Sequence, residues 1–288
     1  MLKIIKRILI PVLLVSVLLF AWGYRRAQLL TDNAGPKISM EEKSITVSVT
    51  DPEEMLLKGI TAYDEKDGDV TGSIVIQSLS NFIEKGRRTM VIASFDQDNN
   101  VTKAEREIVY SDYHSPEVRL DYPLVFSEGL QAGALLSGFT VTDCLDGDLT
   151  NDLTVELENP DSYLDTTLEG SAKVIYTVVN SVGDILEIPA TIRVYNTAFF
   201  RQASRVHLKT YLTAVKQGET LDPFEQIESV EIKGEELRPS QSQVEIRDPA
   251  DTSVPGVYEV LYTVKEDGKT DNSLEIRQIV IVEQEKDG

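Results

Sequence analysis

Two acidic stretches contain the side chains whose types and spacing could most readily do chemistry. Residues 59 to 71 read GITAYDEKDGDVT, and residues 138 to 150 read GFTVTDCLDGDLT. Their carboxylates occupy matching places: Asp64, Asp67 and Asp69 in the first stretch, and Asp143, Asp146 and Asp148 in the second. Several carboxylates in a short segment, with a glycine that permits a sharp turn, could supply the oxygen ligands that Ca²⁺ prefers.

A second interpretation of these stretches needs no metal. Gly68 and Gly147 would supply a positive φ, and the aspartate side chains would accept hydrogen bonds from nearby backbone amides in a turn. The spacing also departs from that of the EF-hand loop, which ends in a bidentate glutamate. We therefore favour a turn that holds no metal and no cofactor, and keep Ca²⁺ as the alternative.

Signatures of catalysis are missing from the sequence. The motifs GxSxG, HExxH, GxGxxG and the P-loop do not occur. His114 and His207 are the two histidines, and neither belongs to a metal or triad spacing, while the one cysteine, Cys144, sits in an acidic loop that would blunt its reactivity. Charged residues make up 26% of the chain, so scattered carboxylates that could form a hydrolase pair carry little information. We expect a protein that is not an enzyme.

The elements that would position the acidic stretches belong to a longer repeat. The two stretches are identical at seven of thirteen positions, at a constant offset of 79 residues. A later segment, GSAKVIYTV at 170 to 178, aligns with GVYEVLYTV at 256 to 264 at an offset of 86. The third unit lacks the DGD element, so it is a divergent copy. Three repeats of this length indicate a tandem array of small domains.

The periodicity inside each repeat is that of β-strands. In the third repeat Tyr258, Val260, Tyr262 and Val264 alternate with Glu259, Thr263 and Lys265, and Val174, Tyr176 and Val178 recur at the matching places of the second. Short strands with turn residues between them point to β-sandwiches with Greek-key connections. We predict an all-β chain: three tandem immunoglobulin-like β-sandwiches after one N-terminal transmembrane helix. Their expected ranges are 36–112, 113–196 and 197–288, the last being divergent.

The hydrophobic start of the chain predicts a membrane anchor. An uncharged run, ILIPVLLVSVLLFAW, is preceded and followed by basic residues. We expect a cytoplasmic N-terminus at residues 1–7, an anchor at 8–24 and a linker at 25–35, with Trp22 and Tyr24 at the outer membrane interface. The excess of basic residues before the run favours an N-terminus in the cytoplasm and C-terminal domains outside the cell.

A cleaved signal peptide is the alternative interpretation of the same segment. Ala21, Trp22 and Gly23 form a small-x-small pattern after a short apolar core, so cleavage near Gly23 would release a secreted protein. Bulky Trp22 and the pair Arg25 and Arg26 argue against cleavage. Both interpretations export the rest of the chain.

The charge of the exported part excludes one class of partner. Residues 1 to 30 contain five basic and no acidic side chains, and the remaining residues carry 23 basic and 48 acidic ones, a net charge of −25. Such a surface repels phosphate backbones, so we expect no nucleic-acid partner. With one cysteine no intramolecular disulfide can form, and stability must come from packing.

The repeated motif resembles a known family. The string G-x-T-x-x-D-x-x-D-G-D-x-T, followed later by G-x-Y-x-V-x-Y-x-V, is similar to the bacterial Ig-like repeats of Gram-positive surface proteins, a module also named for a pesticidal crystal protein. The resemblance covers residues 36 to 284. It implies extracellular modular display, as a stalk or adhesive segment, and no catalysis. The first repeat departs from the family with ASFDQDNNV, and the third has lost the acidic loop.

Aromatic residues near loops and linkers leave two functions open. They are Tyr113, Tyr122, Tyr163, Phe199 and Phe200. Such rings bind glycan or protein ligands in some proteins and pack one domain against the next in others. Our first hypothesis is a display stalk or an adhesion and interaction module of the bacterial cell surface, held in the lipid bilayer by its N-terminal helix. The alternative is a secreted or anchored binding module for a specific cell-envelope glycan or protein, with an enzyme accessory or hydrolase role third.

Overall fold

The computed structural model describes residues 2–30, 33–161 and 165–284, and within them the side chains of all but residues 2–8, 27–30 and 132. Tyr163 and the side chains of Lys3, Lys6 and Arg7 lie outside the described residues. Contacts divide the chain into two units, Met1–Tyr113 and His114–Gly288. Each unit is described by itself.

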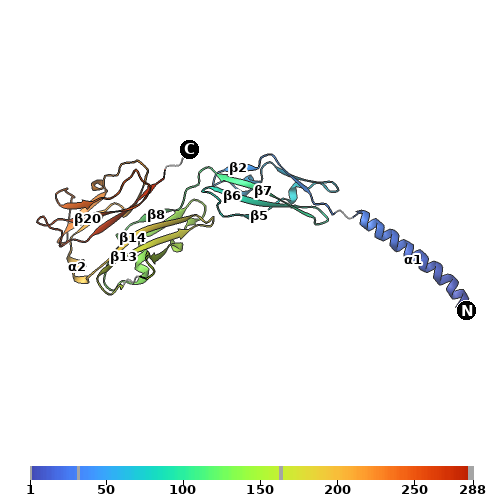
Figure 1. The fold of residues 1–288 in the computed structure, drawn as a ribbon, viewed down its shortest axis with the longest axis horizontal. Coiled ribbons are helices and arrows are strands. Elements are labelled where there is room, and N and C mark those ends of the chain that lie inside the picture. The colour runs from blue at the N-terminus through green and yellow to red at the C-terminus, as the bar shows by residue number, and fades with distance from the viewer. Residues whose placement is uncertain (1, 31–32, 162–164, 285–288) are drawn as a thin grey trace. The chain divides into compact units, whose positions relative to one another are not determined.

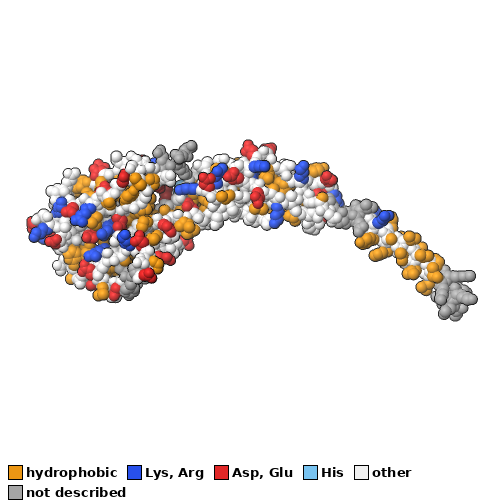
Figure 2. Space-filling view, in the orientation of Figure 1, with side chains coloured by type: hydrophobic (Ala, Val, Ile, Leu, Met, Phe, Trp, Pro, Cys, Tyr) orange, Lys and Arg blue, Asp and Glu red, His pale blue; other side chains and the backbone are white. Residues whose placement is uncertain are grey.

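Helix α1 spans Leu2–Leu30 and carries its apolar side chains on the outside. The segment Leu9–Arg26 has a mean hydropathy of 1.5, and none of it is buried within the chain. Figure 2 shows these hydrophobic side chains, in orange, on the described middle part of the helix. Pro11 lies inside the helix, where its missing N–H leaves the carbonyl one turn earlier without its usual partner. A helix whose uncharged central run is not buried by any described residue matches the requirement of a hydrocarbon core.

The first unit continues into a sandwich of two sheets (Figure 1). One sheet has the order β1-β3-β4 and the other β2-β7-β6-β5. Their strands are β1 (Lys37–Met40), β2 (Ser44–Val47), β3 (Ile60–Asp64), β4 (Gly68–Asp69), β5 (Val75–Leu79), β6 (Arg87–Phe95) and β7 (Val101–Tyr110). Short 3₁₀ helices η1 (Glu53–Leu57) and η2 (Thr71–Ser73) lie between strands. All pairings are antiparallel except that of β2 with β7.

The second unit contains two further sandwiches with the same strand order. In the second sandwich the sheets are β11-β10-β8 and β12-β13-β14-β9, and in the third they are β15-β17-β18 and β16-β21-β20-β19. The second is built from β8 (Glu117–Leu120), β9 (Val125–Ser127), β10 (Phe139–Asp143), β11 (Gly147–Asp148), β12 (Thr154–Leu157), β13 (Gly170–Val179) and β14 (Ile185–Tyr195), with η3 (Ala132–Leu136) and η4 (Thr150–Asp152). The third follows α2 (Thr197–Gln202) and is built from β15 (Arg205–Leu208), β16 (Leu212–Lys216), β17 (Ile227–Ile232), β18 (Glu235–Leu237), β19 (Val244–Arg247), β20 (Gly256–Val264) and β21 (Ile276–Glu283), with η5 (Phe224–Gln226).

The chain is therefore all-β after its N-terminal helix, as the sequence predicts, with an immunoglobulin-like sandwich in each repeat. The predicted alternation fills the cores: Val174, Tyr176 and Val178 of β13 are buried, and so are Val260 and Tyr262 of β20. In the first sandwich, side chains from both sheets, such as Ile60 and Ile92, meet in one apolar cluster. Burying such side chains supplies most of the stability that packing must provide without a disulfide.

The second and third sandwiches share one continuous hydrophobic core. Hydrogen bonds also join them: the carboxylate of Glu259 accepts from the backbone N and the Oγ1 of Thr191 at 2.6 and 2.7 Å. The N of Tyr211 donates to the O of Leu120 at 3.0 Å. Because apolar contact and directional bonds act together, this pair of sandwiches packs as one body.

Candidate functional site

The first acidic stretch forms a tight turn between β3 and β4. Oδ1 of Asp64 accepts hydrogen bonds from the backbone N of Lys66 and of Asp67, both at 2.9 Å. Gly68 has a φ of 79°, a conformation that strains any residue with a Cβ. The buried Asp64 carboxylate thus satisfies the amides of the turn that contains it.

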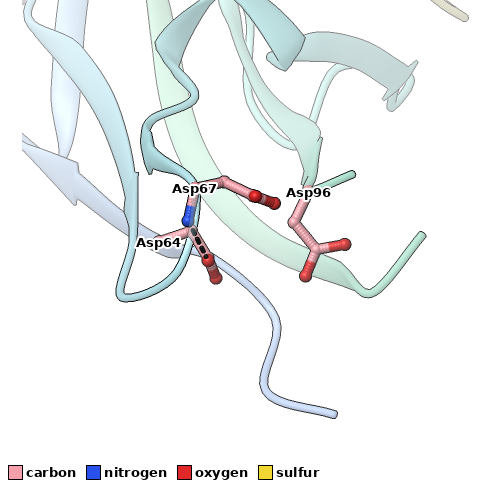
Figure 3. Close-up of side chains that lie close together, drawn as sticks. All are labelled: Asp64, Asp67 and Asp96. Atoms are coloured by element: carbon pink, nitrogen blue, oxygen red, sulfur yellow. Dashed lines mark hydrogen bonds between the residues drawn. The ribbon is translucent and has the colours of Figure 1, made fainter. Parts of the chain in front are cut away.

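The β6–β7 hairpin adds a third carboxylate to this turn. Ligand oxygens of Asp64, Asp67 and Asp96 lie within 4.8 Å of one another (Figure 3). Oδ2 of Asp67 accepts from the N of Gln97 at 2.8 Å, and Oδ1 and Oδ2 of Asp96 accept from the N and Nδ2 of Asn100, each at 2.8 Å. The structure therefore brings a hairpin 30 residues away in sequence onto the acidic turn.

Asp69 does not join this cluster in the described structure. Its Oδ1 accepts from the N of Thr71 at 2.9 Å, and hydrogen bonds from Thr71 lower the pKa of its exposed carboxyl below the ordinary range. Asp96 was absent from the sequence prediction. Its signal in the sequence is the cluster of aspartate and asparagine turn residues from Asp96 to Asn100.

The second acidic stretch folds in the same way. Oδ1 of Asp143 accepts from the N of Leu145 and of Asp146 at 2.8 and 2.9 Å. Asp146 accepts from the N and Oγ of Ser181 at 2.7 and 2.6 Å. Asp148 accepts from the N of Thr150 at 2.9 Å, so it repeats the role of Asp69.

One substitution separates the two turns chemically. Where the first sandwich has Asp96, the second has Asn180, whose Nδ2 donates to Oδ2 of Asp143 at 3.1 Å. A neutral amide therefore replaces a third carboxylate. The oxygen-rich cluster that could hold a hard cation such as Ca²⁺ consists of Asp64, Asp67 and Asp96. These carboxylates already accept hydrogen bonds from the protein, as the turn without a metal requires, and Ca²⁺ binding by the predicted residues stays the alternative prediction.

A hollow of about 370 Å³ lies between the second and third sandwiches. Most of the side chains that line it are apolar or aromatic, and none of the described residues in the lining is an aspartate or glutamate. The lining residues are Tyr122, Pro123, Val125, Phe126, Ser137, Phe200, Arg205, Val206, His207, Tyr211, Leu274 and Ile276. Sequence reasoning singled out Tyr122 and Phe200 as linker aromatics but did not bring them together.

The remaining singled-out residues have ordinary surroundings. His114 faces Glu117 at 3.6 Å, and His207 faces Glu231 at 3.2 Å. Sγ of Cys144 donates to the O of His114 at 3.3 Å. On α1, Trp22 is exposed with the guanidinium of Arg26 over its ring, and the exposed Tyr24 stacks on Phe20.

The sequence comparisons return no family. No family model matches the chain, and no curated protein matches it.

Solved structures give distant matches. One contains the CBM51-2 domain in complex with GlcNAc and the INT domains of ZmpB from Clostridium perfringens: it shares 15% identity over 55% of this chain and 41% of that one, with a TM-score of 0.22. Domains 6–7 of the surface layer protein SbsC are 13% identical to this chain; the match covers 56% of this chain and 98% of that one, with a TM-score of 0.21. Drosophila N-cadherin EC1-4 is 13% identical to this chain; the match covers 88% of this chain and 76% of that one, with a TM-score of 0.22. The chain spans less than half the length of the three ZmpB structures. Such scores assign neither a family nor a function.

Proposed function

We propose that this protein is a non-enzymatic, membrane-anchored module of the bacterial cell surface that displays three immunoglobulin-like sandwiches outside the cytoplasm. One observation carries the proposal: a long apolar helix, unburied by the chain, directly precedes the sandwiches. Side chains such as Leu18 and Phe20 are 67% and 75% exposed. Exposed apolar surface costs about 25 cal/mol per Å² in water, so lipid is the environment that stabilises this helix.

The resemblance of the repeat motif to bacterial Ig-like repeats supports the same function. The three basic residues before the apolar run, against two after it, favour an N-terminus inside and sandwiches outside. In this proposal Trp22 and Tyr24 lie at the outer interface, where amphipathic rings are enriched.

Two measurements on native cells test the proposal. Mass spectrometry of the N-terminus in the membrane fraction should find the chain uncleaved, and protease added to intact cells should remove the sandwiches. A mature chain that begins near Gly23 and lies in the medium would establish the secreted alternative. A protease-resistant chain in the cytosolic fraction would contradict both.

The hollow between the second and third sandwiches favours a second candidate function, a binding module for a cell-envelope ligand. Ligand sites occur preferentially at domain junctions, in apolar hollows with a few convergent polar groups. A pull-down with the purified chain against cell-envelope fractions tests this candidate. Retention of the same envelope component by wild type and by a variant lacking the sandwiches would contradict it.

A further inference from the structure

We propose that the hollow between the second and third sandwiches binds a small hydroxylated carboxylate of the acidic-sugar type, recognised by Arg205, His207 and Tyr122. This proposal rests on the second candidate function and names its ligand class.

The body of the hollow suits a ring of modest size. Val206, Leu274 and Ile276 line it and are about 99% buried within the protein, while the rings of Phe126 and Phe200 form walls. Its volume of about 370 Å³ falls in the lower part of the range typical of small-molecule sites, roughly 300–1,000 Å³. The apolar lining can therefore cover one face of a single ligand ring, and the few polar side chains of the hollow can bind the polar substituents of that ring.

The charge of the lining is opposite to that of its surroundings. Residues 114 to 288 carry 14 basic and 32 acidic side chains, yet the hollow is lined by Arg205 and His207 and by no acidic residue. Nη2 of Arg205 donates to the O of Phe200 at 2.6 Å, which fixes the guanidinium. Its Nη1 makes no hydrogen bond within the described residues and is not among the buried unpaired nitrogens. The guanidinium already faces Oε2 of Glu231 through Nε at 3.6 Å, and Nη1 leaves an N–H group for the carboxylate of a ligand.

His207 adds a place for a hydroxyl group. Its Nε2 lies 3.2 Å from Oε2 of Glu231, and the same oxygen is 3.6 Å from Nε of Arg205. Because a carboxylate only accepts, Nε2 donates to Oε2 of Glu231, and in the tautomer protonated at Nε2 the other ring nitrogen, Nδ1, is an acceptor. No described residue hydrogen-bonds to Nδ1. A ligand hydroxyl can donate to it.

Tyr122 supplies an exposed aromatic surface to the hollow. The residue is 66% exposed, and one edge of its ring lies against Gly138, where an added Cβ would be 2.7 Å from Cδ2. A tyrosine with most of its surface open can stack on the apolar face of a sugar ring. Carboxylate, hydroxyl and ring face thus each have one matching group.

Three probes of matched size test the ligand class on the full chain in detergent. Saturation-transfer NMR should detect glucuronate, with glucose at least about tenfold weaker because it lacks the charge-assisted bond. Benzoate carries a ring and a carboxylate but no hydroxyl, and it should also bind more weakly than glucuronate. Binding of glucose as tight as glucuronate overturns the role of Arg205, and tighter binding of benzoate overturns that of His207.

Tyr122→Ala tests the location. We expect it to weaken glucuronate binding at least about fivefold, while Tyr63→Ala, on an equally exposed tyrosine of the first sandwich, leaves binding unchanged. Arg205→Gln also removes the bond to Phe200, so the exposed Tyr122 is the better probe. Equal binding by both tyrosine variants, or no binding of any probe by an intact folded chain, overturns the proposal. If the Tyr122→Ala variant still retains an envelope component, the protein is a binding module, but the hollow is not its binding site.

Discussion

The side-chain amide of Asn180 donates to Oδ2 of Asp143 at 3.1 Å, and both side chains are buried. The first sandwich reverses this arrangement: Asp96 stands in place of Asn180, and the amide lies four residues later in Asn100, whose Nδ2 donates to Oδ2 of Asp96 at 2.8 Å. The residue aligned with Asn100 is Asp184. In the second sandwich the hairpin amide therefore bonds the carboxylate of the acidic turn, whereas in the first the hairpin carboxylate bonds an amide of its own hairpin.

We expect that the first hairpin can adopt the residues of the second when both positions are changed together. Asp96→Asn alone should place two amides together, and Asn100→Asp alone two carboxylates, each costing about 1–3 kcal/mol of unfolding free energy. The double variant gives the first hairpin the residues of the second, in which the amide donates to the turn carboxylate that corresponds to Asp64, and it should recover most of the loss. Urea unfolding of the four proteins gives the coupling, expected at about 0.5–3 kcal/mol. Additive losses would show that the two positions act independently.

Calcium should have little effect on stability. Asp64, Asp67 and Asp96 already accept hydrogen bonds from backbone and amide donors. We expect the melting temperature to rise by less than about 2 °C when excess Ca²⁺ replaces chelator. A rise of many degrees that is abolished by Asp67→Ala and Asp146→Ala would establish the cation site.

Buried tyrosines should make the second unit sensitive to alkali. The hydroxyl of Tyr176 donates to the O of Leu135 at 2.9 Å, and that of Tyr262 to the O of Pro223 at 3.1 Å. Burial raises the pKa of both phenols far above the ordinary value of about 10. Because the folded state favours the neutral form, this stability is fully present below about pH 10 and is lost as pH rises toward the folded pKa. Absorbance of phenolate should show these rings ionising only as the second unit unfolds.

Tyr176→Phe provides the matching variant. It removes a bond to an otherwise buried carbonyl and should cost about 1–2 kcal/mol at pH 7. Tyr63→Phe, on a 60% exposed ring, should be neutral. Equal stability of the two variants at pH 7 would contradict a structural role for the Tyr176 hydroxyl. The first sandwich achieves the same capping with Arg106, whose Nη1 donates to the O of Leu56 at 3.0 Å.

Alanine substitutions at two glycines distinguish the cost of backbone strain from the cost of a side-chain clash. Gly138 and Gly147 have φ values of 85° and 77°, so an alanine at either position is strained by about 1–2 kcal/mol. A Cβ at Gly147 meets nothing within 4 Å, whereas one at Gly138 would overlap Tyr122. We therefore expect Gly138→Ala to be the more destabilising in urea unfolding. Equal losses would show that Tyr122 moves freely and is not held by the glycine.

The sequence by itself determined the class of structure. A period of two in segments such as 256–264 fixes which side chains of a strand face inward, and a repeat length near 80 residues limits each unit to a small sandwich. The uncharged run before residue 24 likewise determines an exposed apolar helix. These features depend on neighbours along the chain, so they can be read without knowing which strands pair.

Only the tertiary structure decided the sites. Asp96 reaches the acidic turn of Asp64 because β6 and β7 pair and bring their hairpin to it. The hollow joins Tyr122 to His207, which are 85 residues apart and belong to different sandwiches. Side-chain periodicity specifies which face of one strand is apolar. Which of these faces meet depends on the packing of separate sheets, and the spacing of residues along the chain does not encode it.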